Sequence, residues 1–162
     1  MNLVKTIKIS SLGLLLSALP LAATADYLEL PAGLACNDFS LGIDISGGNQ
    51  QVKEFKDADG NIVRTLSTGT GSALKFTNLD SGKTYSTKSN GSNSQTRYNA
   101  DGSSIVTATG HNLLIMFPTD IPPGPSTQII VGRLVYSVST DGVFNIQTIK
   151  GKTSDICEIL SY

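Results

Sequence analysis

The feature that most constrains this chain is a series of short turn signals that recurs between residues 46 and 142. Each signal contains glycine or asparagine, which tolerate the positive φ angles of tight turns. The candidate turns are Ser46-Gly47-Gly48-Asn49, Asp57-Ala58-Asp59-Gly60-Asn61, Gly69-Thr70-Gly71, Asp80-Ser81-Gly82, Asn90-Gly91, Asp101-Gly102 and Asp141-Gly142. The runs between them are rich in Val, Ile, Thr, Tyr and Phe. This spacing predicts an all-β domain of about nine or ten antiparallel strands, either a single β-barrel or a two-sheet β-sandwich, with at most a short helical turn in residues 153–160.

The alternation of apolar and polar residues supports the same fold class. In residues 39–45, Phe39, Leu41, Ile43 and Ile45 share one face, and in residues 73–79 Leu74 and Phe76 do, as in half-buried strands. Residues 83–99 differ, because Tyr85 and Tyr98 are their only large, partly apolar side chains. We expect this segment to be a hairpin that turns at Asn90-Gly91 and forms either a solvated edge or the wall of a water-filled cavity. Asn90 also begins an N-glycosylation acceptor pattern.

The last predicted hairpin allows a prediction of register. A two-residue turn at Asp141-Gly142 would pair apolar with polar side chains. A three-residue turn, with Gly142 in a left-handed conformation, instead pairs Val138 with Phe144 and Tyr136 with Ile146. We predict the second register, because it places all four side chains on one buried face.

The N-terminus has the three parts of a secretory signal peptide. Lys5 and Lys8 precede an apolar stretch, and residues 23–25 are small. We expect cleavage between Ala25 and Asp26, which separates a signal peptide (residues 1–25) from one β domain (residues 26–162). The apolar stretch is too short to span a bilayer comfortably. The protein is therefore expected to be secreted and extracellular, without a membrane association after cleavage.

The two cysteines, Cys36 and Cys157, lie near opposite ends of the expected mature chain. In an oxidising compartment this predicts one disulfide that closes a loop of 120 intervening residues. In the chain-entropy model such a closure stabilises the fold by roughly 4 to 5 kcal/mol. Metal binding is the competing role, but two thiols and one histidine lack a compact ligand spacing.

The charge balance excludes some partners. Without the signal peptide, 10 basic and 13 acidic residues leave a formal charge of −3. A mildly acidic, evenly mixed surface gives no electrostatic reason to expect nucleic acid or anionic lipid as a partner.

The stretch from residue 108 to residue 132 contains the one histidine of the sequence and its one long proline-rich connection. Residues 113–117 are apolar without alternation, which predicts a central strand covered on both faces. Residues 118–126 contain four prolines, which stiffen a loop in extended conformations. This loop is either a crossover between sheets or a contact surface.

No catalytic or metal-binding pattern is found. His111 has no nucleophile elbow to accompany it, although a triad of a serine, His111 and Asp120 would be defined by geometry rather than by sequence. Most carboxylates fall in predicted turns. Residues 57–61 open like a calcium loop, but glycine comes too early and the distal glutamate is missing, so a β-turn is favoured. We therefore expect no catalytic residues, no metal and no cofactor.

Three segments, Leu30 to Gln50, Asp57 to Gly82 and Thr153 to Cys157, resemble those of small secreted bacterial proteins of uncharacterised function. The likeness covers nearly the whole mature chain, including both cysteines. It implies an exported, disulfide-closed domain, and it implies no particular activity or catalytic residue.

The function expected from the sequence is that of a binding or interaction module for a small ligand or a protein partner. The alternatives are a structural, surface-associated protein that self-assembles, with residues 113–117 as the segment to inspect, and a secreted hydrolase. The candidate binding residues are Tyr85, Arg97, Tyr98, His111, Asp120, Pro122 and Pro123.

Overall fold

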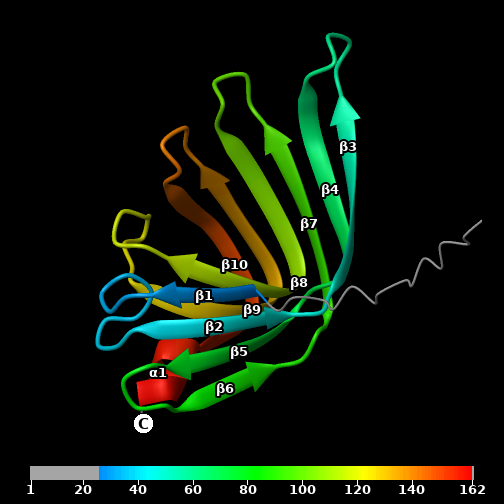
Figure 1. Ribbon diagram of the computed structural model, residues 1–162. Coiled ribbons are helices and arrows are strands. Elements are labelled where there is room, and N and C mark those ends of the chain that lie inside the picture. Colours follow the sequence, from blue (N-terminus) through cyan, green and yellow to red (C-terminus); the bar gives the residue numbers. More distant parts are fainter. Residues whose placement is uncertain (1–25, 162) are drawn as a thin grey trace, which may run out of the picture.

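The computed structural model describes residues 26–161, and these residues form two antiparallel β-sheets and one short helix (Figure 1). The four-stranded sheet has the order β1 (Asp26–Leu30), β2 (Leu41–Ser46), β5 (Ala73–Asn78) and β6 (Thr84–Thr87). The six-stranded sheet has the order β10 (Phe144–Asp155), β9 (Ser126–Val138), β8 (Ser104–Met116), β7 (Gly91–Tyr98), β4 (Ile62–Thr70) and β3 (Asn49–Lys56). Helix α1 (Ile156–Ser161) follows β10 directly.

The all-β prediction is therefore confirmed, and of the two expected architectures the structure is the β-sandwich. Neither sheet closes into a barrel, since each has two different edge strands. The expected signal peptide lies outside the described residues. Within the described part of the chain, no helix is both long and apolar enough to cross a membrane.

Three strand pairs pass from one sheet into the other at the same level of the molecule (Figure 1). β2 continues into β3, β4 into β5, and β6 into β7. The links lie beside one another, because the Gly71 N–H donates to the Asn90 carbonyl (2.7 Å) and the Ser72 hydroxyl donates to the Gly47 carbonyl (3.3 Å). The glycine-rich signals at residues 46–49, 69–71 and 90–91 are thus crossings between sheets and not hairpin turns.

The expected hairpin at residues 83–99 is accordingly wrong. β6 pairs with β5 in the small sheet, while β7 lies between β4 and β8 in the large sheet. Gly91 is absent from the glycines with positive φ, so Asn90-Gly91 does not form the tight turn that this dipeptide favours. The backbone of Asn90 is instead paired with Gly71, in the neighbouring crossing.

The register predicted for the last hairpin is confirmed. Val138 pairs with Phe144 and Tyr136 with Ile146, and Gly142 has a φ of 81°. Beyond Ile146 the ladder shifts at a β-bulge, so that Val135 pairs with Thr148 and Arg133 with Lys150. This one-residue shift exchanges the faces of all later residues in β10.

A row of glycines crosses the six-stranded sheet at the level of the crossings. Gly110, Gly132 and Gly151 pair in sequence across β8, β9 and β10, and Gly69 and Ser92 extend the row through β4 and β7. Gly110 has a φ of 88°, and an added Cβ there would overlap the carbonyl oxygen of Gly91. At Gly132 an added Cβ would overlap the carbonyl oxygen of Lys150. Glycine kinks of this kind bend a sheet, and here they separate the half of the large sheet that faces the small sheet from a distal half.

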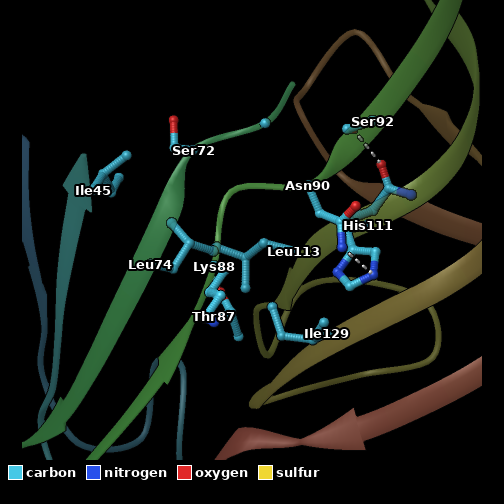
Figure 2. Close-up of a pocket in the computed structure, with 12 residues that line it drawn as sticks. Ile45, Ser72, Leu74, Thr87, Lys88, Asn90, Ser92, His111, Leu113 and Ile129 are labelled. Atoms are coloured by element: carbon cyan, nitrogen blue, oxygen red, sulfur yellow. Dashed lines mark hydrogen bonds between the residues drawn. The ribbon is translucent and has the colours of Figure 1, made fainter. Parts of the chain in front are cut away.

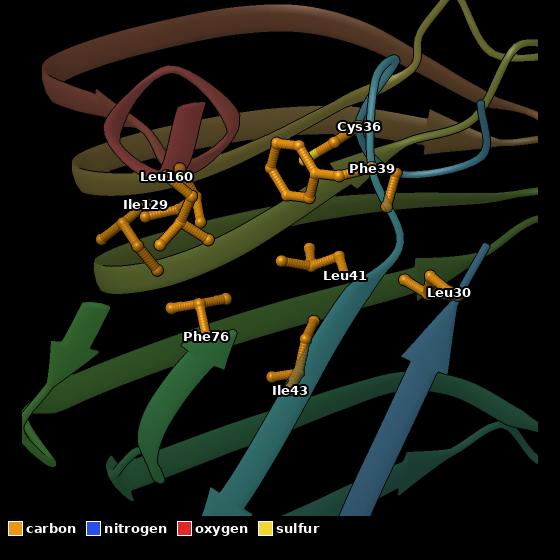
Figure 3. Packing of buried hydrophobic residues seen from close by; sticks show 10 residues of the cluster. Leu30, Cys36, Phe39, Leu41, Ile43, Phe76, Ile129 and Leu160 are labelled. Carbon is orange, nitrogen blue, oxygen red and sulfur yellow. The ribbon is translucent and has the colours of Figure 1, made fainter. Parts of the chain in front are cut away.

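The core lies between the sheets (Figure 3). Leu41 and Ile43 of β2 and Phe76 of β5 are fully buried there against Ile129 of β9 and Leu160 of α1. Burying each of these side chains contributes about 1.5–3 kcal/mol.

The predicted disulfide is present. Cys36 and Cys157 are joined with their Cα atoms 5.5 Å apart, and Cys36 is fully buried. The bond ties the segment between β1 and β2 to helix α1. The Thr127 hydroxyl donates to the Ala35 carbonyl (3.0 Å), which attaches the same segment to β9.

Residues 113–117 pack on both faces, as the sequence predicted. Leu114 and Met116 are buried in a second cluster with Ile130 of β9. Leu113 and Ile115 are half-buried against the main core. No residue of this run is exposed.

Candidate functional site

A cleft opens between the two sheets beside the three crossings (Figure 2). Its inner part is a hollow of about 230 Å³ with Ile45, Leu74, Leu113 and Ile129 as its apolar lining. A second hollow of about 300 Å³ adjoins it and adds Tyr85, Val131 and Lys152. The residues common to both hollows are Thr87, Lys88, Asn90, His111 and Ile129.

His111 lies at the junction of the two hollows, in β8 directly after the kink at Gly110. Its Nε2 is 3.2 Å from the side-chain nitrogen of Asn90, and Figure 2 shows the contact. Since an amide nitrogen only donates, Nε2 accepts this bond and the proton of the neutral ring is on Nδ1. The Asn90 side-chain oxygen accepts from the Gly91 N–H (2.8 Å), which fixes the orientation of the amide.

The distal half of the large sheet carries a second feature, on the face that continues from the cleft. Residues paired directly across neighbouring strands project to the same face of a sheet. Three successive rows follow from the register: Phe55, Arg64, Arg97, Ile105, Ser137 and Asn145; then Lys53, Leu66, Gln95, Thr107, Val135 and Thr148; then Gln51, Thr68, Asn93, Thr109, Arg133 and Lys150. The next row contains His111, Val131 and Lys152, at the mouth of the cleft.

We call this surface the basic face, and its cations are Lys53, Arg64, Arg97, Arg133, Lys150 and Lys152. No aspartate or glutamate occurs in the four rows. The sequence has 12 basic residues, of which Lys5 and Lys8 precede residue 26, so six of the remaining ten lie on this one face. The even mixture of charge expected from composition is therefore not what the surface has.

Contacts between side chains support this assignment of faces. The Arg64 guanidinium lies 3.8 Å from the centre of the Phe55 ring, and the Lys53 ammonium lies 5.2 Å from it. Arg97 and Arg133 line one shallow hollow of about 430 Å³ with Gln95, Ile105 and Thr107. By the usual spacing of strands, the six strands carry this face across about 24 Å.

The basic face contains two like-charge pairs. Arg64 is directly opposite Arg97 on β4 and β7, and Arg133 is directly opposite Lys150 on β9 and β10. Like charges at directly opposed positions destabilise a sheet. The single salt bridge among the described residues joins Lys75 to Asp44 on the small sheet, so none of these four cations is neutralised by a carboxylate.

Acidic residues lie beyond the face, in the turns at the distal ends of its hairpins. Asp57 accepts the N–H groups of Asp59 and Asn61 (2.9 Å each), and these hydrogen bonds, chiefly from Asn61, lower its pKa. This confirms the β-turn favoured for residues 57–61. Asp101 accepts from Ser103 in the next hairpin, which lowers its pKa as well. The turns thus form an anionic boundary to the basic face.

The structure disperses the binding residues expected from the sequence. Tyr85 and His111 line the cleft. Arg97 belongs to the basic face, while Tyr98, the next residue, projects to the opposite face and is 45% exposed. The expected cluster of Tyr85, Arg97 and Tyr98 is therefore not formed.

The proline-rich loop lies elsewhere, against the start of β10. Asp120 is buried, and its carboxylate accepts the N–H groups of Phe117 (2.6 Å) and Phe144 (2.9 Å). Ile121 pairs with Asn145 in an isolated bridge. Pro122 and Pro123 are exposed. Asp120 thus fixes the loop, and the hydrogen bond of the His111 side chain is to Asn90 and not to Asp120.

Five of the cations on the basic face were not among the predicted site residues. Lys53, Arg64 and Arg133 each have a large apolar residue on one side only in their strands, so the local signal was weak. Their convergence depends on the register between six strands, which the sequence does not display. Lys150 reaches the face only because of the bulge after Ile146.

Nothing in the described residues points to a metal centre, since no three His, Cys, Asp or Glu side chains are grouped to hold an ion. The chain matches no protein-family model, no curated protein and no solved structure.

Proposed function

We propose that this protein is an exported binding module that uses the basic face to bind an acidic polysaccharide. The observation that carries the proposal is the convergence of six cations, without a carboxylate, on one face of the large sheet. Five of them lie beyond the row of glycines, where the hairpins extend past the small sheet (Figure 1). Export is supported by the signal-peptide pattern of residues 1–25 and by the disulfide.

The retained like-charge pairs favour a role in binding anions. Arg64 faces Arg97, and Arg133 faces Lys150, each at a cost to the stability of the sheet. A bound polyanion reverses the sign of this interaction, because each carboxylate of the polymer attracts both cations of a pair. A feature that weakens the free protein and strengthens the complex is characteristic of a binding surface.

The other side chains of the face favour a polysaccharide over a single-stranded nucleic acid. Around the cations lie amides and hydroxyls, among them Gln51, Asn93, Gln95 and Thr109, which can exchange hydrogen bonds with sugar hydroxyls. Single-stranded nucleic acid binding depends on aromatic side chains on which the bases stack. The rows of the face contain one Phe, Tyr or Trp residue, Phe55, and its ring is already covered by Arg64.

The proposal is tested by binding of the protein to immobilised alginate, a polymer of uronic acids, at several salt concentrations. Replacing Arg97, Arg133 and Lys150 with serine removes three cations from the face. At about 0.5–1 kcal/mol for each exposed contact, the loss is about 2 kcal/mol, or roughly 30-fold in Kd. Affinity of the unmodified protein should fall steadily with added salt.

The matched control is a triple variant in which Lys56, Lys75 and Lys83 become serine. This control has the same net charge as the variant of Arg97, Arg133 and Lys150, but its three substituted positions lie outside the basic face. We expect its Kd for alginate to stay within about twofold of the unmodified protein. Equal losses in the two variants would show that net charge alone matters and would overturn the proposal. Equally tight binding to duplex DNA would assign the face to polyanions in general and refute a polysaccharide site.

A further inference from the structure

The cleft between the sheets has a composition that differs from that of the basic face and points to a different ligand. Its floor is aliphatic: Ile45, Leu74 and Leu113 line the inner hollow and are only half-buried. Two residues farther along the same strands, Ile43 and Phe76 are completely buried. The core therefore ends at the cleft with unfilled apolar surface, whose removal from water favours the binding of an apolar group.

The mouth of the cleft is cationic. Lys88, in the crossing from β6 to β7, lines both hollows, and Lys152 of β10 lines the outer one. Neither hollow has an aspartate or glutamate in its lining. An anionic group is therefore the charged group that this mouth favours.

Neutral hydrogen-bond donors also line both hollows. Thr87 and His111 line both hollows, and they supply the Thr87 hydroxyl and the Nδ1–H of the His111 ring as donors. The contact with Asn90 holds the His111 ring in this tautomer. A small anion at the mouth thus has hydrogen-bond donors as well as positive charge available.

We propose that the cleft binds an aliphatic carboxylate, with its chain against Ile45, Leu74 and Leu113 and its carboxylate near Lys88, Lys152 and His111. The hollows, of about 230 and 300 Å³, suit a single unbranched chain. A bulky polymer is excluded from the inner hollow by its size. This site is separate from the one proposed for polysaccharide, although Lys152 lies where the two surfaces meet.

The experiment uses protein produced from the full coding sequence and titrates it with decanoate by isothermal calorimetry. Decanol supplies the same chain without the charge, and acetate supplies the charge without the chain. We expect decanoate to bind at least tenfold more tightly than either. Equal binding of decanoate and decanol would overturn the anionic mouth, and equal binding of decanoate and acetate would overturn the apolar floor.

A variant that fills the cleft tests the location. Thr87→Phe places a large side chain at a half-buried position that lines both hollows, in a residue type that strands favour. The matched control is Thr84→Phe, at the exposed opposite end of the same strand β6. We expect Thr87→Phe to weaken decanoate binding at least tenfold and Thr84→Phe to change it less than twofold.

Equal decanoate affinity in the two phenylalanine variants, whether unchanged or lowered to the same extent, would place the ligand elsewhere and refute the proposal. Circular dichroism checks that each variant is folded. If Thr87→Phe does not fold, Ser72→Leu, which fills the inner hollow with an aliphatic side chain, repeats the test. Alginate binding should be unaffected by Thr87→Phe, so failure of this inference is distinguishable from failure of the polysaccharide proposal.

Discussion

The like-charge pair of Arg64 and Arg97 leads to an unusual expectation. Replacing one of these charged strand residues with a neutral residue should make the free protein more stable. The two residues are directly opposed on β4 and β7. For charges about 6 Å apart in a water-like dielectric, Coulomb's law gives a repulsion of about 0.7 kcal/mol. Arg97 is the better position to change, because it is exposed while Arg64 is half-buried over the Phe55 ring.

We expect Arg97→Gln to raise the free energy of unfolding by about 0.5–0.7 kcal/mol at low ionic strength. For a domain of this size, that corresponds to an increase in Tm of about 2 °C. Urea unfolding followed by circular dichroism, together with thermal scans, measures both quantities. The gain should disappear in 1 M salt, where the Debye length is only about 3 Å.

The control is Lys83→Gln, which removes an exposed cation from the turn between β5 and β6 and should leave the free energy of unfolding unchanged. A lower stability of Arg97→Gln at low salt would refute the reasoning, because Arg97 would then stabilise the free sheet. A gain that persists in 1 M salt would attribute the effect to strand propensity and not to charge.

Two further predictions concern the backbone and the turns. Gly132→Ala should destabilise the fold by more than about 2 kcal/mol in urea unfolding, because the new Cβ overlaps the Lys150 carbonyl oxygen, whereas Gly142→Ala, with open space around it, should cost only about 1 kcal/mol. The hydroxyl and the N–H of Ser103 hold the pKa of Asp101 below its usual value of 3.8, so the stability contributed by this carboxylate is complete above that value and is lost as the pH falls through the lowered folded pKa. Unfolding of Asp101→Asn at pH 7 and pH 3 should therefore differ from the unmodified protein more at pH 7, and a larger difference at pH 3 would contradict this sign.

The parts of the fold that were predictable from the sequence are those set by local patterns. The pairs Val138–Phe144 and Tyr136–Ile146 followed from matching apolar faces around a single glycine. The disulfide followed from a count of two cysteines. In both cases the relevant alternatives were few, and each had a distinct physical consequence.

Features that depend on distant strands were not predictable in this way. Asn90-Gly91 has the composition of a hairpin turn, but the pairing of its backbone with Gly71 makes it a crossing between sheets. The bulge after Ile146 has no glycine or proline to mark it, although it decides that Lys150 lies beside Arg133. The charge of a face depends on the registers of all its strands, so it cannot be predicted from the net charge or the composition of the sequence.

The row of glycines has a consequence for how this protein can change over evolution. On one side of the bend, the strands supply the main core, and the disulfide joins the segment between β1 and β2 to helix α1. Substitutions there are constrained by packing. On the other side, the hairpins β3–β4, β7–β8 and β9–β10 extend past the small sheet (Figure 1). Lengthening the β3–β4 and β7–β8 hairpins at their tips by two residues per strand adds one row to the basic face, and the added residues lie away from the main core between the sheets. The bend thus makes the size of the basic face a property that insertions at these hairpin tips can adjust without a change in the main core.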